Sequence, residues 1–456
     1  VPEGYQLNLY AEGLGRVRFM AMSEHGDILM SRPNKGEVVL LKRDANQDGR
    51  ADAEIVLLRD LVTPHGVALA DGWLYIAESN AVGKVAFDSQ TGSLAGDYHH
   101  IAEGFSASGN HWTKSLGLGP DGWLYLTSGS SCNVCEEDDP QRATMMRMKT
   151  DGSELEIVAT GLRNSVGFDW APWDGSLYAT DNGRDLLGDN FPPCELNKIE
   201  LGAFYGWPYI NGDGHLDPDY GQGKEHLLAT ATSPVHAFPA HNAPLGITFL
   251  RHNTMDHYQR SALVALHGSW NRSELDGYKV VSLHWLADGS IVEKDFITGF
   301  LQGSDVIGRP VGMVEASNGD IFVSDDYSGS VFKVRVIDVA AGAQTMSVQA
   351  ETATGPAAIE PAEKVDPDVA LSIYSGEQLR EMQAEGRKLY QQYRCGNCHD
   401  AARATLMRKT IPLVDIAEHY SLEELADFFV APTPPMPVFP LNADQRKALS
   451  VLLYKQ

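Results

Sequence analysis

One short phrase recurs along the first three-quarters of this chain, and it constrains the fold more than any other feature. Most copies place an Asp-Gly or Asn-Gly turn before a short strand of alternating apolar residues that ends in small or acidic residues. The copies span residues 26–31, 71–79, 121–129, 174–182, 318–326 and, in degenerate form, 261–269. Most begin about 45 to 60 residues apart, which is a spacing typical of propeller blades. The sequence therefore predicts a six-bladed β-propeller, with a β-sandwich as the alternative.

The composition changes after the last copy of the phrase. Residues 338–371 contain no aromatic residue and are rich in Ala, Thr, Glu and Pro, which is typical of a linker. Helical periodicity follows, and helices are expected at residues 375–394, 421–430 and 442–455. The predicted protein is mainly β: a propeller over residues 1–337, a flexible linker over 338–374 and a small all-α domain over 375–456. Within the propeller, residues 206–223 are interpreted as an insertion.

The all-α domain carries the most specific motif in the chain. Cys395 and Cys398 with His399 form the CxxCH pattern of c-type haem attachment. Two thiols at this spacing reach the two vinyl groups of one haem, and the adjacent histidine lies beneath the iron. A redox CxxC pair or half of a zinc site are the alternatives, but neither explains the histidine. The sequence thus predicts haem c, which carries single electrons.

The sixth iron ligand is expected to be Met436, which lies in a proline-rich loop before the last helix. Met407 and His419 are the alternatives. The order of helix, CxxCH, Pro-Met loop and last helix resembles a class I cytochrome c. Covalent haems are matured outside the bacterial cytoplasm, so a periplasmic or secreted protein is expected. The start at Val1 is interpreted as the mark of a signal peptide already removed.

Charge limits the partners of this chain. With 36 basic and 61 acidic residues the formal charge is −25, which argues against binding to nucleic acid or to anionic lipid. No apolar run is long enough for an integral membrane span. Small molecules, metal cations and basic protein partners remain as ligands.

The propeller part resembles a known family, the soluble quinoprotein sugar dehydrogenases, and within it the L-sorbosone and pyranose dehydrogenases. The phrases that carry the resemblance lie at residues 109–135, 161–170, 180–185, 192–208, 239–247, 267–272 and 308–313. The resemblance implies a six-bladed propeller that holds pyrroloquinoline quinone (PQQ) and Ca²⁺. No GxGxxG motif follows a strand, so a nicotinamide or flavin site is not expected.

The resemblance also implies roles for single residues. His111 matches the family's general base, since a neutral imidazole can take a proton from a sugar hydroxyl. PQQ carries three carboxylates, and Arg163 and Arg309 match the family's cofactor arginines. Arg163 is expected to act in catalysis as well. The further candidates for contact with the quinone or substrate are Lys114, Arg272, His65, His267 and Asn164.

Two calcium sites are expected. The family's calcium is held mainly by backbone oxygens, which implies the carbonyls of Gly183 and Arg184, with Asp185 as a neighbouring carboxylate. A second site is predicted from an EF-hand-like loop in which Gly49 makes the sharp turn. Its ligands would be Asp44, Asn46, Asp48, the carbonyl of Arg50, and Asp52. Position 12 of this loop is Ile55 rather than Glu, so it is not a complete EF-hand; a polar surface turn is the alternative.

Three cysteines lie outside the haem motif. Cys132 and Cys135 form a tight loop and are the first candidate pair for a disulfide. Cys194 stands where the family often has an acidic residue, which leaves the geometry near it open.

The leading hypothesis is a quinohaemoprotein dehydrogenase. It would oxidise a sugar or a related alcohol or aldehyde, transfer hydride to calcium-bound PQQ and pass electrons through haem c to an external cytochrome or copper protein. The alternatives are a calcium-dependent propeller lactonase or another hydrolase, and a non-enzymatic electron-relay or binding module. The fused haem counts against hydrolysis, which needs no electron sink.

Overall fold

The computed structural model describes residues 1–337, 370–393, 395–399, 413, 416–430, 432, 436 and 439–454. Most of the predicted linker lies outside the described residues, and so does Met407. The side chains of Cys398 and His419 are also outside them. By packing, the chain divides into two compact units, residues 1–337 and 338–456, and each is described by itself. Within the described residues, no helix is long and apolar enough to cross a membrane.

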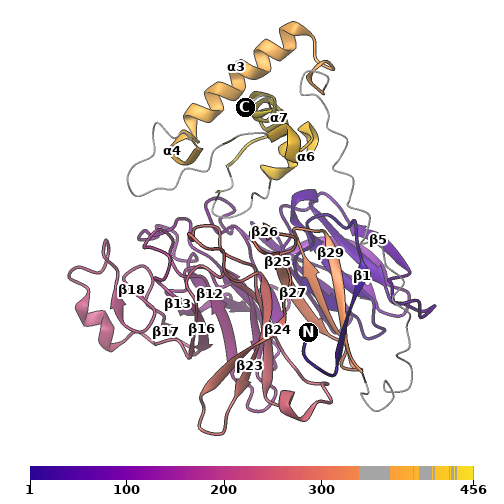
Figure 1. The fold of residues 1–456 in the computed structure, drawn as a ribbon, viewed down its shortest axis with the longest axis vertical. Helices are drawn as coiled ribbons and strands as arrows, with labels where there is room; N and C mark the ends of the chain where they lie inside the picture. Colours follow the sequence, from indigo (N-terminus) through magenta and orange to yellow (C-terminus); the bar gives the residue numbers. More distant parts are fainter. Residues whose placement is uncertain are drawn as a thin grey trace. The chain divides into compact units, whose positions relative to one another are not determined.

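The first unit is a six-bladed β-propeller, as the repeated phrase predicts (Figure 1). Five blades run in chain order from the first to the fourth strand, each paired antiparallel with the next. The four strands of each blade are β2 (Met20–Met22), β3 (Ile28–Arg32), β4 (Glu37–Lys42) and β5 (Ala53–Leu58); β6 (Gly66–Ala70), β7 (Trp73–Ala77), β8 (Ala81–Asp88) and β9 (Ser93–Glu103); β10 (Leu116–Leu118), β11 (Leu124–Ser128), β12 (Thr144–Met148) and β13 (Glu156–Thr160); β14 (Phe168–Trp170), β15 (Leu177–Asp181), β16 (Cys194–Ile199) and β20 (His236–Phe238); β21 (Pro244–Phe249), β22 (Ser261–Leu266), β23 (Lys279–Trp285) and β24 (Ile291–Ile297); β27 (Pro310–Glu315), β28 (Ile321–Asp325), β29 (Ser330–Val336) and β1 (Tyr5–Ala11).

The sixth blade closes the ring by joining the two ends of the propeller sequence. Its outer strand is β1, which pairs antiparallel with β29, so that Tyr5 lies opposite Val336 and Leu9 opposite Phe332. This closure removes the open edge that a linear array of sheets would leave.

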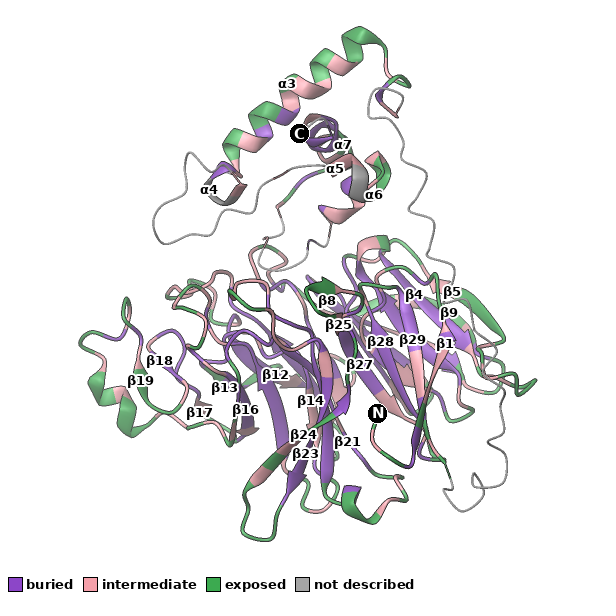
Figure 2. Cartoon of the chain, viewed as in Figure 1, coloured by how far each residue is buried: buried purple, intermediate pink, exposed green. Residues whose placement is uncertain are grey.

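Each copy of the recurring phrase forms the second strand of its blade. In the second blade, Asp71 and Gly72 form a two-residue turn in which both residues have positive φ, at 50° and 76°. This is the geometry that Asp-Gly favours in a tight hairpin. The apolar residues that follow are buried, and Figure 2 colours much of the inner strands as buried.

The first strands of the blades surround a central channel. Neighbouring first strands contact one another around the ring, and all six contribute to the wall of a cavity of about 650 Å³. Small residues permit this approach: a Cβ on Gly246 would lie 2.6 Å from the carbonyl oxygen of Val311 in the next blade.

The predicted insertion into the fourth blade is present between β16 and β20. It contains β17 (Ala203–Phe204), β18 (Ile210–Asn211), β19 (His215–Leu216) and the 3₁₀ helix η2 (Glu225–Ala229). The remaining short elements are η1 (Pro33–Lys35), η3 (Asp256–Tyr258), β25 (Leu301–Gln302) and β26 (Asp305–Val306).

The second unit is helical in its described part, and the three predicted helices are confirmed. They are α3 (Gly376–Gln392), α6 (Leu422–Phe428) and α7 (Ala443–Leu453), with short turns α4 (Gly396–His399) and α5 (Ile416–His419). Ser375, Ser421 and Asn442 cap these three helices through capping boxes. Leu389, Leu425 and Leu449 contribute to a common core.

Helices α3 and α7 cross closely at Gly386. A Cβ at this position would lie 2.5 Å from the carbonyl oxygen of Ala448 and 2.9 Å from the Cβ of Leu452. Since neither a helix backbone nor a Cβ can rotate away, a side chain here would force the helices apart.

We therefore expect Gly386→Val to destabilise the C-terminal unit by about 1–3 kcal/mol, the usual range for overpacking. Thermal unfolding of the full chain, followed by the helical circular dichroism signal, measures the effect. The control is Gly376→Ala on the same helix, where an added Cβ meets no atom within 4 Å. An equal melting temperature for the two variants would contradict the close crossing.

Candidate active site

Two sets of loops meet at one face of the propeller because of the antiparallel pairing of first and second strands. The start of each first strand lies beside the end of the second strand: Gly66 pairs with Ala77, and Pro310 with Asp325. The residues just before the first strands and just after the second strands therefore share one rim. Most of the predicted site residues belong to these loops.

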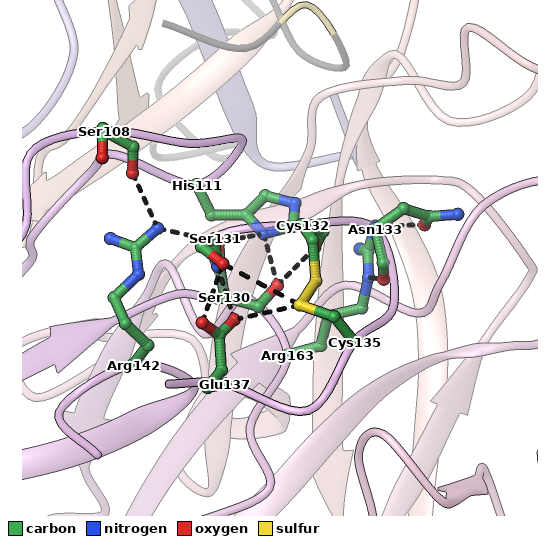
Figure 3. Close-up of a disulfide and its surroundings, with 10 residues drawn as sticks. All are labelled: Ser108, His111, Ser130, Ser131, Cys132, Asn133, Cys135, Glu137, Arg142 and Arg163. Atoms are coloured by element: carbon green, nitrogen blue, oxygen red, sulfur yellow. Dashed lines mark hydrogen bonds between the residues drawn. A yellow bond between two sulfur atoms is a disulfide. The ribbon is translucent and has the colours of Figure 1, made fainter. Parts of the chain in front are cut away.

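His111 is buried in the loop before β10. Its Nδ1 lies 2.9 Å from the carbonyl oxygen of Ser130 and 2.8 Å from that residue's hydroxyl (Figure 3). A carbonyl only accepts hydrogen bonds, so Nδ1 carries the hydrogen and Nε2 is the basic nitrogen. Burial, together with the charges of Arg163 and Arg142, holds the pKa of His111 well below its usual value. The imidazole is thus neutral at neutral pH and able to accept a proton.

Three buried cations lie near His111: Lys114, Arg142 and Arg163. Lys114 donates to the carbonyl of Ser106 at 3.2 Å, and burial, with the charge of Arg142, lowers the pKa of its amine to about 7. Arg142 donates to the carbonyls of Ser106, Ser108 and Ser130 at 3.1, 3.2 and 2.9 Å. Arg142 was missed in the sequence, because it follows an acidic stretch and no pattern marks it.

The polar atoms of this region fit an anionic ligand with carbonyl oxygens and carboxylates. The Nε of Arg142 and the Nε2 of His65 are buried without a hydrogen-bond partner among the described residues. Clustered cations and orphaned polar atoms are costly without a compensating partner. The residues therefore suit PQQ, which carries three carboxylates.

Arg163 was predicted to bind a cofactor carboxylate directly, and the structure shows which protein groups already hold its guanidinium. All five of its N–H groups are engaged by protein oxygens. The bonds run from Nε to Asn133 O (2.9 Å), from Nη1 to Asn182 O (3.0 Å) and Gly183 O (2.8 Å), and from Nη2 to Asn133 Oδ1 (2.8 Å) and Asp185 Oδ2 (2.9 Å). Arg163 thus holds the loop 182–185, while Arg142 and Lys114 have the freer donors.

Loop 182–185 is fixed from its other side as well. The buried side chain of Arg184 forms ion pairs with Asp217 at 2.7 Å and Asp219 at 2.9 Å, both in the insertion. Asp185 also accepts a hydrogen bond from Asn271 at 3.1 Å. The predicted calcium loop is therefore preorganised by ion pairs and hydrogen bonds.

A pair of buried carboxylates lies beside this loop and was missed in the sequence. Asp181 and Glu195 are direct cross-strand partners on β15 and β16. Burial raises the pKa of both groups, and the charge of Glu195 raises that of Asp181 further. Like charges opposite each other on a sheet are destabilising unless something compensates them.

The two carboxylates contribute to the wall of a cavity of about 20 Å³, close to the volume that one water or ion occupies. The Oδ1 atoms of Asn182 and Asn197 are buried nearby without a partner among the described residues. Carboxylate, amide and carbonyl oxygens are the ligands of hard cations, so this donor set suits Ca²⁺.

A second cluster lies on the rim around blades five, six and one. His267 Nε2 is 2.8 Å from Asp326 Oδ1, and Asp326 also pairs with Arg18. Burial, together with the charge of Arg309, lowers the pKa of His267 to about 4. Arg18 and Asp326 were not recognised in the sequence, since they are separated by 308 positions.

The other predicted ligands lie on this side of the rim or near it. Arg309 donates to the carbonyls of His267 at 3.1 Å and Gly268 at 2.8 Å, and its guanidinium lies over the ring of Tyr278. His65 is fully buried against Phe19. Arg272 is half-buried and donates to the carbonyls of Asp189 and Ala240.

Comparison with known proteins gives this site its family. The TrAA12-like family profile matches residues 1–195 and 221–336, leaving out most of β16 and part of the insertion that follows it. The chain belongs to the TrAA12-like family.

Curated relatives of this TrAA12-like chain carry names that agree with the site. A PQQ-dependent pyranose dehydrogenase of Coprinopsis cinerea is 30% identical over 407 residues, which cover 74% of this chain and 54% of the relative. A PQQ-dependent sugar dehydrogenase of Hypocrea jecorina is 23% identical over an aligned region that covers 72% of this chain and 87% of the relative. An uncharacterized protein of Borreliella burgdorferi is 37% identical over an aligned region that covers 46% of this chain and 56% of the relative. The chain spans about half the length of the first curated relatives it matches.

Solved structures share the TrAA12-like fold. The holo form of the pyranose dehydrogenase PQQ domain from Coprinopsis cinerea has a TM-score of 0.65 at 22% identity, covering 74% of this chain and 96% of that domain. A calcium structure of a Trichoderma reesei family AA12 enzyme has a TM-score of 0.64 at 21% identity, with the same two coverages.

The EF-hand-like loop of the TrAA12-like propeller forms the predicted sharp turn at Gly49, where φ is 90°. Its carboxylates accept backbone hydrogen bonds: Asp44 from Gly49 at 2.9 Å, Asp48 from Arg50 at 2.8 Å, and Asp52 from Ala45 at 3.1 Å. Asn46 accepts from the amide of Asp48 at 2.8 Å. The three carboxylates are not gathered at one point, so calcium in this loop stays a prediction.

The TrAA12-like unit contains one disulfide and one free thiol. Cys132 and Cys135 form the predicted disulfide, with Cα atoms 6.2 Å apart. Cys194 is a buried thiol on β16, and burial raises its pKa to about 11.

The C-terminal unit lies outside the TrAA12-like match, which ends at residue 336. Cys395 immediately precedes α4, and His399 ends it, so both belong to one helical turn. Met436 packs against the core of this unit. Haem attachment at this turn, with Met436 as sixth ligand, stays a prediction.

Proposed function

We propose that this chain is a PQQ- and calcium-dependent sugar dehydrogenase whose C-terminal unit carries haem c. The observation that carries the proposal is the neutral, buried His111 beside three buried cations and a preorganised loop of carbonyl oxygens. The relatives named as PQQ-dependent pyranose and sugar dehydrogenases support the same chemistry.

The residues of the chain divide the work of oxidation. His111 holds its Nε2 lone pair ready to take the proton of the substrate hydroxyl, since Ser130 fixes the ring through Nδ1. Lys114, Arg142 and Arg309 would bind the cofactor carboxylates, and Asn164 a carbonyl oxygen. Asp181, Glu195 and the loop 182–185 would hold calcium, with Arg163 fixing the loop. When bound, PQQ accepts hydride and calcium polarises the accepting carbonyl.

The haem supplies a path for single electrons to an external acceptor, a soluble cytochrome or a copper protein. The CxxCH turn, the capped helices and the close crossing at Gly386 support a cytochrome c domain. Because haem c is attached outside the bacterial cytoplasm, we place the protein in the periplasm or outside the cell.

The test of the proposal is a spectroscopic titration. Oxidised holoprotein is incubated with PQQ and Ca²⁺, a panel of sugars is added, and the haem absorption bands are followed. We expect reduction of the haem that requires sugar, PQQ and calcium together. A normal haem spectrum with neither quinone binding nor reduction would refute the dehydrogenase; lactone hydrolysis in the same preparation would then identify the alternative.

Calcium is expected to stabilise the propeller through Glu195. At a free concentration about 100 times Kd, a bound ion adds about 2.7 kcal/mol of stability. Replacing Glu195 with Gln removes a ligand charge, so most of the rise in melting temperature between chelator and calcium should disappear. The control is Glu200→Gln, one residue past the end of β16 and exposed. Full retention of the calcium effect in Glu195→Gln would place the ion elsewhere.

A further inference from the structure

The four-residue loop closed by the Cys132–Cys135 disulfide lies against the catalytic face, directly beside His111 and Arg163 (Figure 3). It follows β11, the second strand of the third blade, and so belongs to the loops that form the rim. Asn133 lies inside the disulfide-bonded loop, and its side chain points toward Arg163.

Asn133 forms hydrogen bonds to Arg163 and to Asp185 through its backbone carbonyl and through both polar atoms of its side chain. Its carbonyl and Oδ1 accept from Nε and Nη2 of Arg163 at 2.9 and 2.8 Å. The same Oδ1 accepts from the amide of Asp185 at 2.8 Å, and Nδ2 donates to the carbonyl of Asp185 at 3.2 Å. Asn133 thereby bridges the guanidinium of Arg163 and the end of loop 182–185.

The residues that precede the bridge are tied to the other half of the site. The carbonyl of Ser130 accepts from His111 and from Arg142, and the Ser130 hydroxyl donates to the carbonyl of Cys132 at 2.7 Å. Ser131 donates to Glu137 through its amide and its hydroxyl, at 2.6 and 2.7 Å. One short segment thus contacts the base, the cations and the calcium loop.

The disulfide is better suited to local positioning than to global stability. Its cysteines are three positions apart, and the stabilisation by a disulfide grows with the length of the loop it closes. What the bridge restricts is the conformation of Asn133 and its neighbours, which exchange many polar contacts with the site. A side chain held in this way loses little further freedom when its partners bind.

We propose that Asn133, held by the Cys132–Cys135 disulfide, is a positioning residue that keeps Arg163 and loop 182–185 in the arrangement that receives cofactor and calcium. The proposal rests on the proposed function for its consequence, tighter cofactor binding. It has a second consequence that does not depend on any ligand: the amide of Asp185 is protected from solvent by Asn133.

The test uses Asn133→Ala in the full-length holoprotein, with Val134→Ala in the same loop as the matched control. Hydrogen exchange followed by mass spectrometry, without PQQ, reports on the peptide that contains Asp185. We expect exchange in this peptide to be about 5- to 30-fold faster in Asn133→Ala, as the loss of one or two hydrogen bonds implies. Exchange in the outer strands and the melting temperature should stay as in the control.

Cofactor binding supplies the second readout. The Kd for PQQ in saturating calcium should rise about tenfold or more in Asn133→Ala, while kcat at saturating PQQ stays within about twofold, since His111 is untouched. The double variant Cys132→Ser/Cys135→Ser, which keeps Asn133 but releases the loop, should shift both readouts in the same direction by a smaller amount.

The outcomes separate the two proposals. Unchanged exchange at Asp185 in Asn133→Ala overturns the positioning role, and so does faster exchange spread over the whole propeller with a lower melting temperature. If the wild-type protein binds no PQQ, the proposed function fails, while the exchange experiment still decides whether Asn133 holds the loop.

Discussion

Replacing His111 with Ala is expected to lower the rate of sugar oxidation by about 10²- to 10⁴-fold, the usual contribution of a general base. The cations of the site remain, so the affinity for PQQ should change little. The measurement is the single-turnover rate of haem reduction after mixing the PQQ- and calcium-loaded protein with sugar. His99→Ala, on the exposed outer strand β9, is the matched control and should keep the wild-type rate.

The protonation of His111 is also expected to determine how the rate of sugar oxidation depends on pH. Because the pKa of His111 is well below its usual value of 6.5, the imidazole stays neutral as the pH falls through that value. The rate should therefore hold its plateau below about pH 6.5 and decline only when the depressed pKa is reached. A wild-type profile with an inflection near pH 6.5 that is absent in His111→Ala would contradict the buried, neutral base.

The second large effect is expected in the C-terminal unit. Cys395→Ser/Cys398→Ser should abolish the covalent haem, because no thiol is left to bond the vinyl groups. Haem staining after denaturing electrophoresis measures the attachment. Reduction of an external cytochrome should then fall to background, whereas a dye that takes electrons directly from the propeller should still be reduced by sugar.

Cys194→Ser is the control for this variant, since it removes a thiol of the propeller and leaves the CxxCH turn intact. Retention of covalent haem by the double serine variant would refute the attachment. Replacing Met436 with Ala tests the sixth ligand separately: the haem should stay attached and change its absorption spectrum. An unchanged spectrum would direct attention to Met407 and His419.

The propeller could be predicted from the sequence because each blade repeats the same turn-and-strand pattern. An Asp-Gly turn followed by alternating apolar residues predicts a strand wherever it occurs, and six such strands fit a propeller. His111, Lys114 and Asn164 were proposed as site residues from the family resemblance rather than from the repeat. They lie in loops whose place on the rim follows from the repeat.

The site residues that the sequence did not reveal are those whose role depends on contacts between residues far apart in the chain. Asp181 and Glu195 become a candidate cation site only because the register of β15 and β16 places them opposite each other. Arg163 looks in the sequence like a free cation for a carboxylate. In the structure the backbone of residues 182–183, Asn133 and Asp185 engage all of its N–H groups. Backbone carbonyls carry no side-chain signal, so such contacts need the structure.

The pairing of β1 with β29 links the order of folding to the assembly of the site. The outer strand of the last blade is made first during synthesis and must wait, unpaired, until the partner at the far end of the propeller sequence exists. The ion pair of Arg18 with Asp326, which holds His267, forms across the same junction. One half of the rim is therefore complete only after the ring has shut, whereas the half around His111 lies within contiguous blades. A partly folded chain would thus contain His111 in place before Arg18 and Arg309 have reached their positions. Binding of the proposed cofactor would then be acquired only at the final step of folding.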